Sequence, residues 1–331
     1  MTMQRDGDVV VIGAGMAGVA CARRLLAAGA SVRVVEKSRG AGGRSTTRRV
    51  GDERLDLGAP YVHTPGGRFR DLVRTCASAG AAAPWRPRIG IFDRGRLVVT
   101  EGAATERFVG IPGMSALVRC LASGMEISTG VRVARLELVH GRWNVYAEDG
   151  SSVGSFPRVV VAVPAPQAVG LLGAAPGFAE QAAAVRMSST WSAGLLFDER
   201  LPIEVDVGYV YGAPLALLVR DSAKPGRGTE GESWVVHASR DWSADNLERP
   251  GEQIAEEILE QLARLLRTNL PAPREVVVHR WRYASAVAPL ASDFLVDGTG
   301  TLAACGDWCR GTTLEAAFVS GDRLGARLAE G

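Results

Sequence analysis

The fold is decided near the amino terminus by Val9-Val10-Val11-Ile12-Gly13-Ala14-Gly15-Met16-Ala17-Gly18, in a chain of 331 residues. The apolar, β-branched run over 9–12 predicts a buried parallel strand. Residues 16–28 are rich in Ala, Leu and Arg and are followed by Gly29, which predicts a helix. A second apolar run over 32–35 predicts the next strand, so this region reads as one βαβ unit.

The glycines of this stretch follow the pattern G-x-G-x-x-G directly after a strand. Gly13 permits the tight turn, Gly15 lets the backbone approach a pyrophosphate, and Gly18 lets the helix pack closely on the strand. The N–H groups at the start of the helix favour phosphate charge. The predicted contacts come from Gly13, Ala14, Gly15, Met16, Ala17 and Gly18.

Glu36 ends the second predicted strand, at a position from which its carboxylate can accept hydrogen bonds from a ribose. The next segment, Lys37-Ser-Arg-Gly-Ala-Gly-Gly43-Arg44, continues the glycine-rich pattern, which a simple NAD domain does not need. Gly58-Ala59 form a further tight turn after a short strand. These features predict FAD, with Lys37 in the ribose loop and Arg44 near the pyrophosphate or the flavin.

The carboxyl-terminal end returns to the nucleotide-binding pattern. A strand over 301–305 precedes Gly306-Asp307, and a helix is predicted over 314–330. We expect Asp307 to accept a hydrogen bond from the ribityl chain rather than to act as a base. Glu315, in the first turn of that helix, completes the predicted cofactor set.

The middle of the chain has a different character. Strands are predicted over 190–197, 207–211, 216–220, 234–238 and 276–278, and an amphipathic helix over 250–266. The Pro- and Gly-rich segment 224–232 reads as a solvent loop. We expect a discontinuous α/β dinucleotide domain over 1–75, 110–165 and 285–331, with an inserted α+β substrate domain over 76–109 and 166–284 built on a mixed or antiparallel sheet.

The composition argues against several classes of function. The net charge of +2 gives no field that would recruit nucleic acid or an anionic membrane. No stretch reaches the roughly 20 apolar residues of a membrane span. Five cysteines, an odd number, suit a reducing cytoplasm, and their spacing does not indicate a metal site. The oligomeric state cannot be read from the sequence.

Together these motifs resemble the FAD-containing amine oxidase superfamily, in which an acidic residue and then G-G-R follow the first glycine motif. In that family a strand backbone at the position of Val133 contacts adenine, and 110–115 resembles the loop and helix before that strand. The resemblance implies a Rossmann-type FAD-binding domain of the p-hydroxybenzoate hydroxylase-like kind. It also implies FAD held noncovalently, since no Cys or His matches a position of covalent flavin attachment.

Within the superfamily, short segments along nearly the whole chain resemble the renalases, especially the bacterial ones. They include 55–59, 112–116, 163–168, 279–281 and 305–309. The resemblance implies an oxidase that takes hydride from aberrant 2- or 6-dihydro isomers of NAD(P), regenerates NAD(P)+ and passes the electrons to O2 to give H2O2. The segment 285–289 departs from those relatives, which affects the substrate rather than the cofactor.

The inventory of lysines and tyrosines bears on the substrate. Many amine oxidases of the superfamily hold a lysine near the flavin and flank the flavin with tyrosines. This chain has only two lysines, Lys37 and Lys224, and no tyrosine after Tyr283. A flavin amine oxidase or desaturase remains an alternative, and a non-catalytic binding protein on the same fold, as in the Rab GDP-dissociation inhibitors, is a third.

Four residues are candidates for the substrate site. Trp281 and Trp191 could form an aromatic wall, although core packing explains each equally well. His237 follows an apolar strand and is either a core histidine or an active-site one. His63, after Tyr61 on a short strand, could lie near the flavin.

Overall fold

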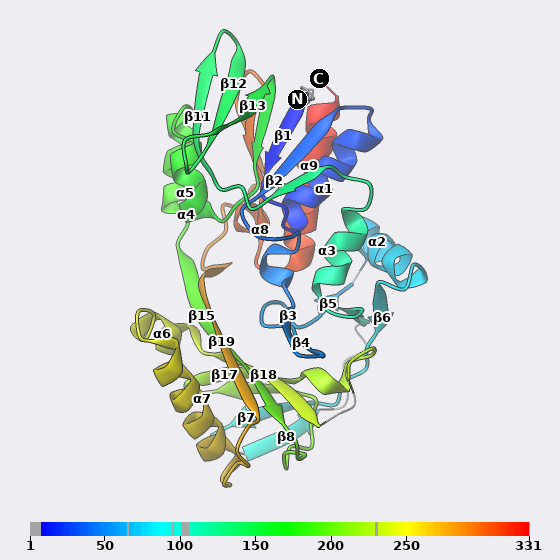
Figure 1. Ribbon diagram of the computed structural model, residues 1–331, viewed down its shortest axis with the longest axis vertical. Helices are drawn as coiled ribbons and strands as arrows, with labels where there is room; N and C mark the ends of the chain where they lie inside the picture. The colour runs from blue at the N-terminus through cyan, green and yellow to red at the C-terminus, as the bar shows by residue number, and fades with distance from the viewer. Residues whose placement is uncertain (1–7, 65, 95, 101–105, 229–230, 331) are drawn as a thin grey trace. The chain divides into compact units, whose positions relative to one another are not determined.

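A computed structural model describes residues 8–64, 66–94, 96–100, 106–228 and 231–330. The chain divides into two compact units. The first, here the dinucleotide unit, comprises 1–43, 118–187 and 285–331, and the second, the inserted unit, comprises 44–117 and 188–284. The predicted architecture, a Rossmann-type domain with an inserted domain, is confirmed (Figure 1).

The dinucleotide unit is built on a six-stranded sheet of order β10-β2-β1-β14-β21-β20. The first five strands are parallel and β20 is antiparallel to β21. The strands of this unit are β1 (Val9–Ile12), β2 (Val32–Glu36), β10 (Ile127–Thr129), β11 (Val133–Val139), β12 (Arg142–Ala147), β13 (Ser152–Phe156), β14 (Arg158–Val161), β20 (Leu295–Val296) and β21 (Leu302–Ala304). Its helices are α1 (Met16–Ala27), α4 (Ala165–Leu171), α5 (Pro176–Ala184), α8 (Asp307–Arg310) and α9 (Leu314–Ala329).

Both faces of this parallel sheet are covered, which explains the apolar runs in β1, β2 and β14. Helices α1 and α9 lie side by side (Figure 1), and the Cβ that an alanine at Gly321 would carry falls 2.0 Å from the Ala17 carbonyl oxygen. Val10 and Ile12, on the opposite face, share a core cluster with Trp143 of the β11–β13 meander and with α4. Helix α4 was not predicted; it begins where Pro164 and Pro166 end the strand before it, because proline suits the first turn of a helix.

The inserted unit is built on a seven-stranded sheet of order β19-β15-β18-β17-β16-β7-β8. Only the β16–β7 pairing is parallel among the registers given for it. The strands of this unit are β3 (Arg48–Val50), β4 (Glu53–Leu55), β5 (Val62–His63), β6 (Ala82–Pro84), β7 (Ile89–Asp93), β8 (Arg96–Thr100), β9 (Arg107–Gly110), β15 (Met187–Phe197), β16 (Val207–Tyr211), β17 (Leu215–Arg220), β18 (Glu232–Ala238) and β19 (Glu275–Ala286). Its helices are α2 (Gly67–Ser78), α6 (Arg240–Asp245) and α7 (Gly251–Leu266), a 3-10 turn η2 lies at Asp221–Ala223, and η1 (Gly43–Ser45) and α3 (Ser115–Leu121) cross the boundary between the units.

The two faces of the seven-stranded sheet differ in what covers them. Along β15, alternate residues such as Ala193 and Leu195 pack with Ile254 and Ile258 of α7. The residues between them face the other way, where Leu196 packs with Leu55 in a second, smaller cluster. In Figure 1, α7 runs along the outside of this sheet.

The unit boundaries differ from the predicted ones in three segments. Residues 44–75 and 110–117 were assigned to the dinucleotide domain but belong to the inserted unit, because Leu55 and Leu57 pack against its sheet. Residues 166–187 were assigned to the inserted domain but belong to the dinucleotide unit, because α4 and α5 pack on its core. Neither difference moves the glycine motif or Glu36.

Candidate functional site

The first glycine turn requires glycine at both of its ends. Gly13 has a φ of +109°, and a Cβ at this position would lie 2.6 Å from the Ala162 carbonyl oxygen. A Cβ at Gly18 would lie 2.0 Å from the Gly13 carbonyl oxygen. Gly15 is the N-cap of α1, carries no side-chain cap, and has open space where a Cβ would be. The N-terminus of α1 is therefore open to a phosphate.

Glu36 ties the glycine turn to the second strand. Its Oε2 accepts the Ala14 N–H at 2.8 Å and its Oε1 accepts the Ser38 N–H at 2.8 Å, while the residue is only 6% exposed. A carboxylate has about four acceptor positions, so two bonds leave capacity for ribose hydroxyls. This geometry suits the ribose contact predicted from the sequence.

The second glycine loop folds back on the first. Gly42 donates its N–H to the Ala14 carbonyl at 3.0 Å, and a Cβ at Gly43 would lie 3.2 Å from the Gly15 Cα. The segment that leads into Val133 is held beside Glu36, because Val131 donates its N–H to the Glu36 carbonyl at 3.0 Å. The position proposed for adenine thus lies next to the one proposed for ribose.

The returning end of the chain adds Asp307 to this unit. Asp307 is 4% exposed at the start of α8, and Gly306 donates its N–H to the Ser320 hydroxyl at 2.9 Å. Glu315 lies in the first turn of α9. Lys37 is exposed, and its Nζ lies 3.4 Å from the Gln167 Oε1. The dinucleotide unit therefore holds the predicted cofactor residues other than Arg44, Gly58 and Ala59.

Arg44, Gly58 and Ala59 form one tight arrangement in the inserted unit. The Arg44 carbonyl accepts the Ala59 N–H at 2.9 Å, and a Cβ at Gly58 would lie 1.9 Å from that same oxygen. The Arg44 Nη1 donates to the Ala284 carbonyl at 3.0 Å. Trp281 donates its Nε1–H to the Leu57 carbonyl at 2.8 Å. The turn over 57–59 thus fixes both Arg44 and Trp281.

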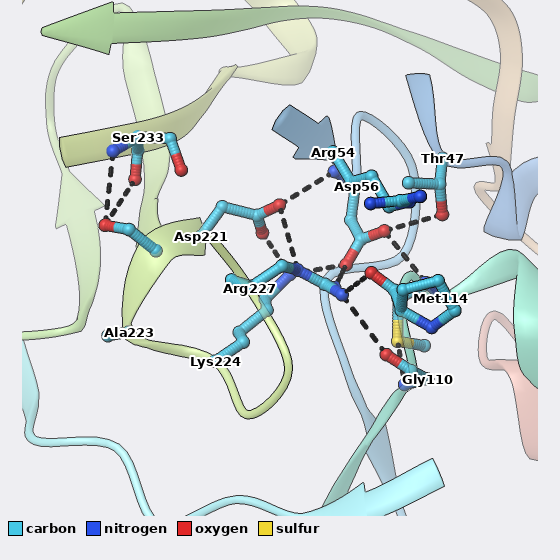
Figure 2. A network of polar contacts seen from close by, with 12 residues as sticks. Thr47, Arg54, Asp56, Gly110, Met114, Asp221, Ala223, Lys224, Arg227 and Ser233 are labelled. Atoms are coloured by element: carbon cyan, nitrogen blue, oxygen red, sulfur yellow. Dashed lines mark hydrogen bonds and ion pairs between the residues drawn. The ribbon is translucent and has the colours of Figure 1, made fainter. Parts of the chain in front are cut away.

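A buried ion cluster of Asp56, Asp221, Lys224 and Arg227 lies directly beside this turn (Figure 2). The Lys224 ammonium pairs with both carboxylates, 2.9 Å from the Asp56 Oδ2, and the Arg227 guanidinium also pairs with both. The side chains of the two aspartates and Lys224 are fully buried. Met114 N–H and the Thr47 hydroxyl donate to the Asp56 Oδ1, each at 2.8 Å.

The pKa values of the two aspartates in the ion cluster are shifted in opposite directions. Burial alone would raise the pKa of Asp56, but the charges of Lys224 and Arg227 and the hydrogen bonds it accepts hold that pKa below its usual value. Burial raises the pKa of Asp221, and the neighbouring Asp56 carboxylate adds to the effect. Asp56 is therefore the stronger acid of the two aspartates.

The ion cluster corrects the prediction of a solvent loop over 224–232 at Lys224, whereas Gly226, Gly228 and Gly231 are exposed as predicted and residues 229–230 lie outside the described residues. Lys224 is 3% exposed and Glu232 is 7% exposed, where its carboxylate accepts the Trp234 Nε1–H at 2.9 Å. Charged residues next to proline and glycine usually mark a solvated turn. Here Lys224 and Arg227 are held by Asp56, which is far away in the sequence, as well as by the nearby Asp221.

The aromatic wall predicted from Trp191 and Trp281 also needs correction. Trp191 belongs to the core cluster under α7 and donates its Nε1–H to the Asn246 carbonyl at 3.1 Å. Trp281 instead contacts the turn over 57–59. Because strand residues alternate between faces, the two rings lie on opposite sides of the sheet. Trp191 is a core residue, and His279 is the ring next to Trp281, with centroids 4.1 Å apart.

His63 is exposed and lies beside a pair of tyrosines. The hydroxyls of Tyr61 and Tyr209 form a hydrogen bond, and the Tyr61 ring meets His63 edge-on at 5.2 Å between centroids. Burial and the charge of Arg107 lower the pKa of His63. The sequence did not indicate this pairing of tyrosines, because Tyr209 lies on β16 and Tyr61 lies just before β5.

His237 has an unpartnered ring nitrogen. Its Nε2 is shut off from solvent and has no hydrogen-bond partner among the described residues. Burial, and then the charge of Lys224, lower its pKa to about 4. The imidazole is therefore neutral at physiological pH, so it can donate or accept a hydrogen bond without bringing charge into the site.

We expect His237 to make the stability of the protein depend on pH. The folded state keeps the ring neutral, whereas the unfolded chain protonates it below about pH 6.5. Unfolding therefore becomes easier as the pH falls from about 6.5 to about 4. Urea unfolding across this range should show that His237→Gln loses less stability than the wild type. A variant whose stability follows the wild-type pH curve would contradict the assignment.

Two family models match the chain. Residues 11–76 match the NAD(P)-binding Rossmann-like domain, and residues 93–328, well over half of the chain, match the flavin containing amine oxidoreductases. The chain belongs to the flavin-containing amine oxidoreductase family. The members of this family are flavin-containing oxidoreductases, and the prediction of FAD as the cofactor is confirmed.

Curated relatives share only part of their length with this chain. The probable polyamine oxidase 5 of Arabidopsis thaliana is 29% identical over 164 residues, which is 46% of this chain and 31% of that protein. A pseudooxynicotine dehydrogenase from a Pseudomonas species is 43% identical over 58 residues, 18% of this chain and 12% of that protein. The chain thus spans less than a third of these relatives.

Solved structures match the whole fold. A protein described as a protoporphyrinogen oxidase, from an Exiguobacterium species, has a TM-score of 0.79 at 14% identity and covers 100% of this chain and 99% of its own. Cyclohexylamine oxidase from Brevibacterium oxydans has a TM-score of 0.74 at 14% identity, over 98% of this chain and 99% of its own.

Among the described residues, no helix is long and apolar enough to cross a membrane.

Proposed function

We propose that this flavoprotein is an oxidase of aberrant dihydro-NAD(P) isomers, those reduced at ring position 2 or 6. The substrate gives up one hydride and leaves as NAD(P)+. When bound, FAD would supply the hydride acceptor and pass the two electrons and the proton of that hydride on to O2, which leaves as H2O2 after taking up one further proton from solvent. The net reaction consumes one dihydro isomer, one O2 and one proton.

The observation that carries this proposal is where the two lysines of the chain lie. The Lys224 ammonium is fully buried between the Asp56 and Asp221 carboxylates, so it is not free to accept a proton from a substrate or from a water. Lys37, the other lysine, is exposed on the dinucleotide unit beside Gln167. A site without a lysine base suits a substrate that needs none.

A dihydronicotinamide is such a substrate. It is already a hydride donor, and its product is an aromatic pyridinium, so no base has to remove a proton. The protein must mainly orient the ring and exclude competing reactions. We assign FAD binding to the glycine turns, Glu36, Arg44 and Asp307, and substrate contacts to Trp281 and His237, with His63 as a further candidate.

An amine or a desaturase-type substrate is the second candidate. It is favoured by the names of the relatives, which include a polyamine oxidase, a pseudooxynicotine dehydrogenase and a phytoene desaturase. Those matches each cover less than half of this chain. The two candidates differ in their chemistry. An amine must be in its unprotonated form before it can be oxidised, whereas a dihydropyridine gives up hydride without first losing a proton.

A steady-state assay separates the two candidates. Holoenzyme is incubated in air with a mixture of dihydro-NAD(P) isomers made by chemical reduction of NAD(P)+, and in parallel with putrescine, spermidine and cyclohexylamine. We expect NAD(P)+ and H2O2 to form in equal amounts from the isomers, and no H2O2 from the amines. H2O2 from an amine, or no turnover of the isomers, would overturn the proposal.

A further inference from the structure

A row of residues crosses the seven-stranded sheet of the inserted unit. Tyr209 on β16 is the Cα partner of Leu217 on β17, which is in turn the partner of His237 on β18. His237 is directly opposite Ser192 on β15. Residues opposite one another on neighbouring strands point to the same face. We call Tyr209, Leu217, His237 and Ser192 the cross-sheet row.

The cross-sheet row faces away from α7. The neighbours of its members along the strands, Ala193 on β15, Leu218 on β17 and Val236 on β18, lie in the core cluster with Ile254 of α7. Strand alternation therefore turns Ser192 and His237 to the opposite face. Leu196, on that same face of β15, packs with Leu55, which directly precedes Asp56.

Two polar atoms at the end of this row lack partners. The Ser192 hydroxyl oxygen and the His237 Nε2 are both shut off from solvent, and neither has a hydrogen-bond partner among the described residues. Ser192 is 0% exposed. Side chains opposite one another on paired strands have Cβ atoms roughly 5 Å apart, close enough for one ligand group to reach both. Buried polar atoms normally have partners, so an adjacent orphaned pair indicates a binding position.

The chemistry of this pair suits an uncharged group with both a donor and an acceptor. Neutral imidazole and a hydroxyl can each donate or accept one bond. The cross-sheet row contains no carboxylate that could pair with a ligand cation. An ammonium group therefore fits poorly, whereas an amide offers a carbonyl acceptor and N–H donors.

We propose that Ser192 and His237 form a subsite for a primary carboxamide, the group that a dihydronicotinamide carries on its reacting ring. This inference rests on the proposed function for its substrate, but its geometry lies within the inserted unit alone. A ring fixed by its carboxamide has a defined orientation, so the subsite determines which ring carbon can give up hydride.

The test compares two ligands that differ only in the amide nitrogen. Binding of NAD+ and of its 3-acetylpyridine analogue, in which a methyl group replaces the NH2, is measured by calorimetry on the holoenzyme. We expect the wild type to prefer NAD+ by roughly 10-fold or more, since a buried polar group left unpaired by the analogue weakens its binding. Ser192→Ala should lower NAD+ affinity roughly 10-fold and leave the analogue nearly unchanged.

Matched variants separate the subsite from general damage. Ser233, on β18 opposite Leu196, also has a buried hydroxyl without a hydrogen-bond partner among the described residues. Ser233→Ala removes that hydroxyl and should keep the wild-type preference for NAD+ over the analogue. His237→Gln retains a donor and an acceptor and should keep more of the preference than His237→Phe. If His237→Phe does not fold, the Ser192→Ala and Ser233→Ala comparison carries the test.

Several results would overturn the subsite. They are equal binding of both ligands by the wild type, no binding of either, equal loss of both in Ser192→Ala, or no change for either in Ser192→Ala, which would mean that the pair holds only a water. Failure of the proposed function looks different: the wild type would prefer NAD+ over the analogue but would not oxidise the dihydro isomers.

Discussion

Lys224→Met is expected to destabilise the protein by about 3–5 kcal/mol, the usual cost of removing one partner from a buried ion pair. The methionine fills a similar volume but leaves Asp56 and Asp221 facing only the Arg227 guanidinium. Both carboxylates are fully buried, so neither can recover its solvation. Urea unfolding of the holoenzyme, followed by circular dichroism, measures the loss.

Two further variants make the Lys224 experiment specific. Arg264→Met removes an exposed pair with Glu260 on α7, and should change the free energy of unfolding by less than about 1 kcal/mol. Adding Asp221→Asn to Lys224→Met removes one uncompensated carboxylate and should restore part of the lost stability. A Lys224→Met protein within about 1 kcal/mol of the wild type would show that the cluster is solvated.

Gly18→Ala is expected to produce protein largely without flavin. The added Cβ would lie 2.0 Å from the Gly13 carbonyl oxygen, so the turn between β1 and α1 must open. Overpacking of this kind costs about 1–3 kcal/mol, which corresponds to roughly 5- to 150-fold weaker FAD binding if the cost falls on the bound state. The ratio of flavin to protein absorbance after purification, and titration of stripped protein with FAD, measure the effect.

Gly170→Ala is the matched control for the glycine turn. Gly170 lies inside α4 of the same unit, and its added Cβ meets open space. Alanine is the better helix former by about 1 kcal/mol, so this variant should be as stable as the wild type or slightly more so. Flavin retained at wild-type levels in Gly18→Ala would contradict the assigned role of the turn.

The dinucleotide unit could be predicted from the sequence because its signals are local. The run over 9–18 specifies a strand, a turn and a helix within ten residues, and Glu36 follows at the end of the next strand. The need for glycine at Gly13, Gly18 and Gly321 comes from backbone atoms of the same unit. A Cβ at these positions would collide with Ala162, Gly13 and Ala17, respectively. Local consistency of this kind makes a fold readable from one sequence.

The inserted unit was less readable because its decisive contacts are distant in sequence. No spacing rule links Asp56 to Lys224, so the loop over 224–232 was read from its proline and glycines alone. Alternation predicted that neighbouring residues of β15 would face opposite ways, but not which face α7 would cover. Trp191 was therefore chosen as a site candidate, and Ser192 beside it was missed.

The strand register identifies the residue opposite His237, which the sequence alone does not reveal. The sequence left this histidine as either a core residue or an active-site one, and its strand neighbours could not decide between them. The pairing with Ser192 places two unpartnered polar atoms together, which a satisfied core histidine does not have.

Anaerobic mixing of the holoenzyme with one equivalent of a dihydro-NAD(P) isomer, followed through the visible flavin band, tests whether the isomer gives hydride to the bound flavin without help from a protein base. We predict complete bleaching within seconds and one equivalent of NAD(P)+, while amines leave the flavin oxidised. Rapid bleaching by amines, with the isomers inert, would rule out the proposed reaction.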